Sequence, residues 1–342
     1  MFIRNAWYFA GFSTEFDSHL VERKLLGEPV VFFRSASETV VALSNRCPHR
    51  FAPLSMGRLI DDRIQCAYHG IEFDCTGKCV RIPGQERIPA DAAVRKYPLA
   101  ERWGCVWIWM GDPAHAREEG LVGEFHFFEE QDWVSVHGMK EVAAGYELII
   151  DNLMDLTHIA FLHPNTLGGD ASAAEAPVKA TVEGDTVAIE RIVRNAQPAP
   201  LFTRVKKIEG RVDRYQQSRF VPPCFVLIDL KVMPAGTQEL DKGIEWRVFH
   251  IVTPIDADRT RYHWVVTRHF AQQDREVSRA IQEGTDATLE EDRIMIEAQA
   301  RMLEGTSLEA RTLYTRFDTT PTRVRRIITG LVEREAGTAL VV

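Results

Sequence analysis

Two short Cys/His pairs in the first third of the chain have residue types and a spacing that suit a metal centre. Cys47 and His49 form a C-x-H motif, and Cys66 and His69 form a C-x-x-H motif. Each pair follows a short apolar run that is typical of a β-strand, so a β scaffold can bring the two pairs together. Thiolate sulfur and imidazole nitrogen are ligands for zinc and for iron–sulfur clusters. The sequence therefore predicts a metal centre held by these four side chains.

The way in which the two motifs share the ligands favours a two-iron cluster. Structural zinc sites usually take like ligands from each turn, whereas each motif here offers one sulfur and one nitrogen. In a Rieske [2Fe-2S] centre two histidines replace two cysteines on one iron, so each loop supplies one Cys and one His. We therefore expect a Rieske cluster on Cys47, His49, Cys66 and His69. A zinc site and a chance grouping of core residues remain the alternatives.

A second group of polar residues lies in an otherwise apolar stretch. Asn152, Asp155, His158 and His163 occur within one short run, and buried polar groups need partners, so the run indicates a site. His158 and His163 are five positions apart, which is about 140° around a helix. Because Pro164 disfavours helical geometry at His163, we expect the helix to open there and the second imidazole to turn toward the first.

Two histidines alone leave a mononuclear iron short of a carboxylate. A 2-His-1-carboxylate site leaves other positions open for dioxygen. In a helix expected over 274–304, Asp292 falls on the apolar stripe together with Leu289, Met295 and Ile296. An acid on a buried stripe is costly unless it is paired or binds metal. By itself, Asp292 also fits a surface or salt-bridging acid.

The loop motifs resemble those of a known enzyme family. CPHR at 47–50 and CAYHG at 66–70 resemble the cluster loops of Rieske non-haem iron oxygenases. Within that family the chain is similar to the vanillate and dicamba O-demethylase oxygenases, also through NAWYFAG at 5–11 and RFAPLS at 50–55. The resemblance implies two cofactors, a [2Fe-2S] Rieske cluster and a mononuclear Fe(II). The two histidines of the family's D-x2-H-x4-H motif match His158 and His163, and the family's late carboxylate matches Asp292. The resemblance therefore implies that these three residues bind the Fe(II).

The resemblance also implies roles for further residues. The Asp that corresponds to Asp155 accepts a hydrogen bond from an iron-binding histidine and reaches the second cluster histidine, here His69, of a neighbouring subunit. That contact is an electron route in head-to-tail rings of three, so we expect a homotrimer. Asn152 is assigned a supporting role. His250 matches a substrate-facing histidine of the dicamba-type enzymes, although Ile228 stands about where that relative has Asn.

The implied activity is oxidation of a methyl or methoxy group of a small aromatic compound by O2, most simply O-demethylation with release of formaldehyde. We expect a separate ferredoxin or flavin reductase to donate the electrons, because no Gly-rich dinucleotide fingerprint follows a strand. Alternatives within the family are methyl or ring hydroxylation and N-dealkylation. Alternatives of other classes are a Rieske electron carrier without oxygenase activity and a zinc-stabilised binding module.

The elements that must position these residues indicate an α+β protein with two domains. Short apolar runs and turn signals over 5–110 are typical of a small antiparallel β domain. The polar segment 112–120 marks a boundary, so we expect a Rieske domain over 1–115 and a catalytic domain over 116–342. The second is expected to be a helix-grip domain, a twisted antiparallel sheet with helices. Its expected strands are 186–193, 218–233, 244–255 and 261–270, and its expected helices are 146–163 and 274–304.

Composition excludes several function classes. The chain has 342 residues, 45% of them hydrophobic, which is enough for two cores. A net charge of -8 argues against nucleic acid and anionic membranes as partners. We find no apolar segment of bilayer-spanning length and no cleavable leader, and so expect a cytoplasmic protein. Six cysteines are too sparse for a disulfide framework, so they are expected to be reduced thiols or metal ligands.

Overall fold

The computed structural model of the chain forms two compact units. It describes residues 1–168, 171–237, 242–307, 310–311 and 313–339. Apart from Met1, contacts divide the chain into one unit over Phe2–Gly123 and a second that begins at Glu124. The expected domain boundary between 115 and 116 stays a prediction. Within the described ranges no helix is both long and apolar enough to cross a bilayer.

The first unit consists of three small antiparallel sheets, as the sequence predicted. Their strand orders are β1-β10-β9, β2-β3-β4 and β5-β6-β7-β8. Apolar side chains of these strands, among them Phe33, Leu43 and Phe73, form a buried core that also contains Cys47 and Cys66. The strands are β1 Trp7–Phe12, β2 Val21–Leu25, β3 Glu28–Arg34, β4 Val40–Ser44, β5 Arg58–Ile60, β6 Arg63–Gln65, β7 Glu72–Phe73, β8 Cys79–Arg81, β9 Leu99–Arg102 and β10 Cys105–Trp109.

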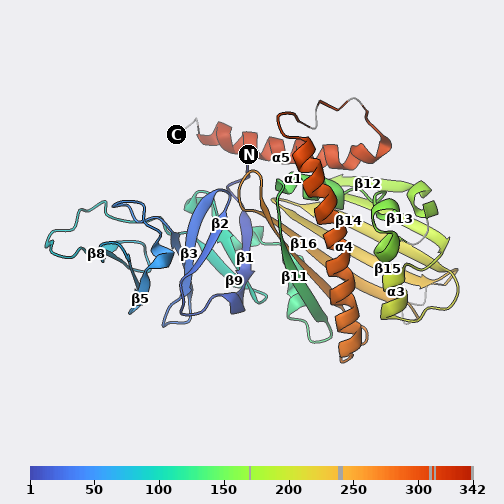
Figure 1. The fold of residues 1–342 in the computed structure, drawn as a ribbon, viewed down its shortest axis with the longest axis horizontal. Helices are drawn as coiled ribbons and strands as arrows, with labels where there is room; N and C mark the ends of the chain where they lie inside the picture. Colours follow the sequence, from blue (N-terminus) through green and yellow to red (C-terminus); the bar gives the residue numbers. More distant parts are fainter. Residues whose placement is uncertain (169–170, 238–241, 308–309, 312, 340–342) are drawn as a thin grey trace. The chain divides into compact units, whose positions relative to one another are not determined.

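The second unit is built on one seven-stranded antiparallel sheet, the twisted sheet expected for a helix-grip domain (Figure 1). The strand order is β11-β17-β16-β15-β14-β13-β12, so consecutive strands from β12 to β17 are neighbours and β11 pairs with β17. The strands are β11 Val134–Val142, β12 Val178–Glu183, β13 Thr186–Ala196, β14 Val212–Val221, β15 Phe225–Pro234, β16 Ile244–Pro254 and β17 Thr260–Arg268.

One strand prediction was wrong. The apolar run 218–233 was expected to be a single strand, but it contains the end of β14 and most of β15, which pair as a hairpin from Val221–Phe225 onward. Pro222 and Pro223 lie at the turn. Proline has no N–H to donate to a sheet ladder, so two of them in sequence end the strand.

In the part of the chain that the structure describes, five α-helices accompany the sheet, and α4 lies across it in Figure 1. α4 contacts β11, α1 and α3. Its N-terminus is capped by Asp274, whose side chain accepts from the N–H groups of Glu276 and Val277. α5 was not expected from the sequence. The helices are α1 Tyr146–Leu153, α2 Ile159–Leu162, α3 Pro200–Val205, α4 Arg275–Met302 and α5 Thr319–Ala339.

The helix expected over 146–163 is broken before His158 as well as at its end. α1 ends at Leu153, and the Asp155 carboxylate accepts from the N–H of Thr157 over 2.7 Å. Such a side-chain bond competes with helical hydrogen bonds, which explains the interruption. α2 then begins after His158 and ends at Leu162, so the chain leaves the helix at His163, as Pro164 predicted.

Candidate metal centres and active site

The two Cys/His loops share one backbone hydrogen-bond pattern. In each loop the Cys N–H donates to the carbonyl five residues later, and the N–H four residues later donates back to the Cys carbonyl, over 2.8–2.9 Å. Each loop also has one residue in the left-handed region, Phe51 with φ 58° and Gly70 with φ 70°. Cys47 and Cys66 are thereby placed at equivalent positions of two matching turns.

Sulfur and nitrogen ligands occupy separate places in these loops. Cys47 and Cys66 are buried, whereas His49 and His69 are exposed. The Nδ1 atoms of the two histidines lie 3.2 Å apart. Burial raises the pKa of the Cys47 thiol, and the neighbouring Cys66 raises it further, so binding a cation would stabilise the thiolate form. The two loops therefore offer two buried sulfur atoms and two exposed nitrogen atoms as ligands.

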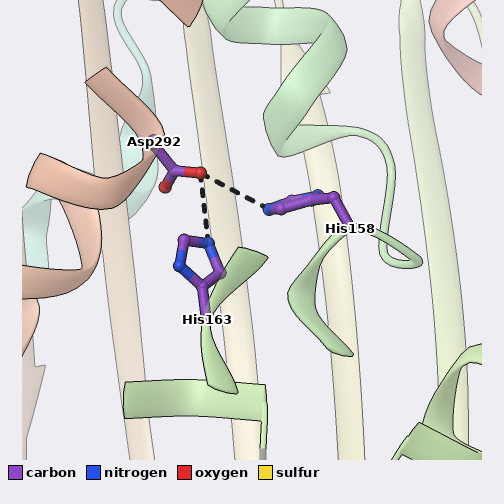
Figure 2. Close-up of side chains that lie close together, drawn as sticks. All are labelled: His158, His163 and Asp292. Carbon is purple, nitrogen blue, oxygen red and sulfur yellow. Dashed lines mark ion pairs between the residues drawn. The ribbon is translucent and has the colours of Figure 1, made fainter. Parts of the chain in front are cut away.

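Three side chains from the second unit converge on one point. Figure 2 shows His158 and His163 directed at the carboxylate of Asp292 from the opposite helix. Nε2 of His163 lies 3.1 Å from Oδ1 of Asp292, and Nε2 of His158 lies 3.6 Å from the same oxygen. One ligand atom from each residue lies within 4.8 Å of the other two. These three residues can therefore hold one metal ion.

Burial and mutual charge set the electrostatics of this group. Burial opposes ionisation of Asp292, but His163, His158 and Asn152 hold the pKa of its carboxyl below the ordinary value. Burial lowers the pKa of His158. It opposes the charged form of His163 too, yet Asp292 and Glu291 raise the pKa of that imidazole. An anionic carboxylate between two imidazoles also suits a divalent cation.

Further hydrogen bonds fix the three side chains in place. Nδ2 of Asn152 donates to Oδ1 of Asp292 over 3.0 Å. Nδ1 of His163 lies 2.8 Å from Oε2 of Glu291, and the hydroxyl of Thr166 donates to the same carboxylate oxygen over 2.9 Å. A carboxylate on the far nitrogen of a histidine fixes the tautomer and leaves the near nitrogen free to bind metal.

The backbone after His163 closes tightly around this group. Pro164–Gly168 forms a π-helical turn, and the N–H of Gly168 donates to the carbonyl of His163 over 2.8 Å. A Cβ at Gly168 would stand 2.7 Å from that carbonyl oxygen and 2.8 Å from the carbonyl oxygen of Ile159, so only glycine fits. Single π-helical turns of this kind are frequent at functional sites.

Comparisons with known proteins match both units. Residues 6–98 match the family described as Rieske [2Fe-2S] domain, and residues 142–334 match the family described as Vanillate O-demethylase oxygenase C-terminal domain. The iron-sulfur subunit of the toluene-4-sulfonate monooxygenase system of Comamonas testosteroni is 40% identical over 314 residues, 89% of each chain. The vanillate O-demethylase oxygenase subunit of Pseudomonas sp. (strain HR199 / DSM 7063) is 34% identical over 353 residues, covering 100% of this chain and 99% of the relative.

A solved structure agrees with these sequence matches. The crystal structure of dicamba monooxygenase bound to 3,6-dichlorosalicylic acid superposes with a TM-score of 0.90 at 31% identity, covering 98% of this chain and 99% of the other. The chain belongs to the Rieske non-haem iron oxygenases. The electron-carrier and zinc-module alternatives are not favoured, because the second unit of this Rieske oxygenase matches an oxygenase domain.

The residues of this Rieske oxygenase fit both cofactors of the family. Among the described residues, His158, His163 and Asp292 are the only group of three or more whose ligand atoms converge within 4.8 Å. The Cys and His of the two loops therefore do not meet at a single point, as a four-ligand zinc site requires. Their division into sulfur and nitrogen pairs suits two irons of different ligation.

Asp155 makes a different contact from the one implied by the family resemblance. Nδ1 of His158 lies 2.5 Å from the main-chain carbonyl oxygen of Asp155, and the Asp155 carboxylate binds the N–H of Thr157 instead. Within the one chain described, then, the hydrogen bond to the histidine comes from the backbone. The expected bridge from Asp155 to His69 of another subunit stays a prediction.

A cavity lies between the sheet and α4 of this oxygenase, near the candidate metal-binding residues. Its walls are mostly apolar and include Ile228, Trp246 and Leu289. His250 also lines it, and its Nδ1 lies 2.6 Å from the hydroxyl of Tyr262. Burial lowers the pKa of His250 to about 4, so its imidazole is neutral at neutral pH.

Sequence reasoning missed Glu291 and overextended the apolar stripe of α4. Met295 was placed on that stripe but is 53% exposed, whereas Leu289, Asp292 and Ile296 are buried. The buried side of α4 includes Gly284 and Thr288 instead. The only sequence signal for Glu291 is its position next to Asp292, since adjacent residues point about 100° apart and one helix can then contact both sides of a histidine.

Asp292→Ala is expected to remove the mononuclear iron and leave the Rieske cluster. Wild-type protein should contain about three irons and two acid-labile sulfides per chain, and the variant about two irons with unchanged sulfide and cluster absorbance. Metal analysis and visible spectroscopy measure both. Asp286→Ala, at an exposed acid of the same helix that pairs with Lys140, is the control. Loss of cluster absorbance in Asp292→Ala would contradict the assignment.

Glu291→Gln is expected to weaken the mononuclear site without abolishing it. Loss of the carboxylate that holds Nδ1 of His163 should lower iron affinity about 10- to 100-fold. Competition with a chelator measures this affinity. Glu290→Gln changes the adjacent residue, which pairs with Arg293 and Lys140, and should leave the affinity unchanged. Equal affinities in both variants would show that Glu291 does not position the histidine.

Proposed function

We propose that the chain is the terminal oxygenase of a multicomponent monooxygenase that oxidises a methyl or methoxy group of a small aromatic compound. One observation carries the proposal: a buried His158, His163 and Asp292 group lies beside a largely apolar cavity. The relatives support it, because they include a vanillate O-demethylase and a toluene-4-sulfonate monooxygenase subunit. O-demethylation is the proposed reaction, and methyl hydroxylation is the second candidate.

The proposed cofactor ligands follow from the geometry. Cys47 and Cys66 would bind the cluster through Sγ, and His49 and His69 through their facing Nδ1 atoms. His158, His163 and Asp292 would bind the iron. When bound, the two groups supply single electrons and the activation of dioxygen, which no side chain can supply.

The protein's own groups orient the ligands and shape the reaction space. Asn152 holds the Asp292 carboxylate, and Glu291 holds the His163 ring. Thr288 and Leu289, one turn before Asp292, line the cavity, so a bound aromatic ring lies close to the metal-binding elements. The apolar walls exclude water from that space, which favours oxidation of the substrate over side reactions.

His250 is proposed to contact the substrate. Burial raises the pKa of Tyr262, so that hydroxyl keeps its proton and can donate it to Nδ1 of His250. The neutral imidazole then carries its own proton on Nε2. As a residue of the cavity wall, His250 can donate this proton in a hydrogen bond to a substrate oxygen.

A separate protein must supply the electrons, and we propose a ferredoxin or a flavin reductase. The exposed side chains next to the cluster loops include His49, His69 and the cations Arg46 and Arg50, which suit an acidic donor. We also propose a homotrimer, in which Asp155 of one subunit reaches His69 of the next. We further propose a cytoplasmic location, which agrees with cysteines that are cluster ligands or reduced thiols and form no disulfide.

A product screen tests the proposed reaction. The purified oxygenase, supplied with a ferredoxin and reductase, is given methoxybenzoates and methyl-substituted aromatic compounds under air. Formaldehyde together with the corresponding phenol indicates O-demethylation, whereas a benzylic alcohol indicates methyl hydroxylation. Asp292→Ala is the inactive control. Ring diols, or no product from any methyl or methoxy compound despite a full iron content, would contradict the proposal.

Asp155→Asn is expected to slow product formation while both metal sites stay filled. The proposed bridge to His69 of a neighbouring subunit depends on the carboxylate, and the amide is a poorer acceptor. Rapid-quench measurement of a single turnover, started with fully reduced enzyme, gives the rate. Asp151→Asn on α1, an acid that pairs with Arg325, is the control. An unchanged single-turnover rate would argue against the electron route.

A further inference from the structure

One end of the cavity carries a polar group that the proposed reaction does not use. On β14 the side chains of Arg214, Gln216, Ser218 and Phe220 alternate toward the buried face of the sheet. Arg214 and Gln216 both line the cavity. Nη2 of Arg214 donates to the side-chain oxygen of Gln216 over 2.8 Å.

Arg214 is a buried cation without a counter-ion. Its side chain is only 6% exposed, and no Asp or Glu among the described residues forms an ion pair with it. Nη1 donates to the carbonyl of Leu167 over 2.8 Å, and the guanidinium lies 5.2 Å from the ring centre of Phe202. Nε is buried and has no hydrogen-bond partner. A buried charge of this kind is costly unless something neutralises it.

A neighbouring cation increases this cost. Arg191 on β13 is 2% exposed and close enough to disfavour the charged form of Arg214. Burial and this repulsion lower the pKa of Arg214 to about 9, so the side chain is still charged at neutral pH. Arg191 pairs in the sheet ladder with Gln216, two residues from Arg214, so it adds positive potential near this end of the cavity, and the charge of Asp155 partly offsets it.

The position of Arg214 relative to His250 gives the cavity two different ends. In the sheet ladder, His250 on β16 lies opposite Val226 on β15, and Val226 lies opposite Phe220 on β14. Phe220 is six residues along β14 from Arg214. Six residues of strand span about 20 Å, and the Arg214 side chain reaches back toward Gln216. Apolar side chains, among them Ile228, Leu230 and Trp246, line the space between the ends. Such a cavity suits an apolar ring with a negative group at one end.

We propose that the substrate of this oxygenase is an aromatic anion whose carboxylate or sulfonate is bound by Arg214 and Gln216. The inference rests on the proposed function, because it assumes that the cavity holds the substrate. When the amide of Gln216 reorients, Nη2 of Arg214 is released to donate to an anionic oxygen, and the amide itself donates to a second one. The rest of the aromatic ring extends along the apolar walls toward His250.

Equilibrium binding to the anaerobic holoenzyme tests this inference without turnover. Titration calorimetry compares each anion with a neutral partner of the same shape: 4-methoxybenzoate with 4-methoxybenzamide, and 4-methylbenzenesulfonate with 4-methylbenzenesulfonamide. Wild type is expected to bind at least one anion about 10- to 100-fold more tightly than its amide, the range of a charge-assisted hydrogen bond. The pair of compounds that shows the preference identifies the anionic group of the substrate as a carboxylate or a sulfonate.

Variants of the protein test whether Arg214 causes the preference for the anion. Arg214→Gln is expected to abolish it with little change in affinity for the amide, whereas Arg214→Lys keeps the charge and should retain part of it. Arg219→Gln is the matched control, because Arg219 lies on the same strand, points to the other face and pairs with Glu124. Cluster absorbance and the thermal midpoint confirm that each variant folds. If Arg214→Gln does not fold, the wild-type and Arg214→Lys titrations decide.

The possible results separate this inference from the proposed function. No preference for either anion in wild type, or a preference that survives in Arg214→Gln, overturns the role of Arg214 and leaves it as a structural anchor for the Leu167 carbonyl. Anion binding that depends on Arg214, in an enzyme that forms no oxidised product, supports the binding site and contradicts the proposed function instead.

Discussion

A buried carboxylate that needs partners organises the catalytic unit of this Rieske oxygenase. Asp292 lies on the inner side of α4, where an unpaired charge would destabilise the fold. Its partners, Asn152, His158 and His163, come from a segment far earlier in the chain. The same contacts that satisfy the charge therefore hold α1 and α2 against α4, and they also create the metal-binding group.

Irregular backbone makes this convergence possible. Two histidines five positions apart on one regular helix would point about 140° apart. The break after Leu153 and the π-helical turn that starts at Pro164 release both residues from that geometry. Gly168 then allows the turn to pass close to the carbonyl of His163. Local departures from helical structure are therefore part of the site.

The sheet supplies the other half of the active site. Its inner face presents a mostly apolar wall, which His250 interrupts near one end and Arg214 and Gln216 interrupt near the other. Strand alternation gives this face side chains from every second residue of β14, β15 and β16. The residues of this face, rather than the candidate metal ligands on the helices, line most of the cavity. In the proposed binding mode, Arg214 is the residue of this face that selects for an anionic substrate.

The amino-acid sequence indicated the two Cys/His motifs and the His158 and His163 pair, because the members of each are close together in the chain. Asp292 lies far from that histidine pair in the sequence and was assigned through the family resemblance. The sequence also predicted the antiparallel β unit, the sheet-and-helix class of the second unit and the whole of α4. The sequence could not show that Glu291 holds His163 or that Arg214 lacks a counter-ion, since these facts depend on residues brought together by folding. The hairpin within 218–233, the break before His158 and the exposure of Met295 were likewise decided by tertiary packing, which selects among local patterns of similar energy.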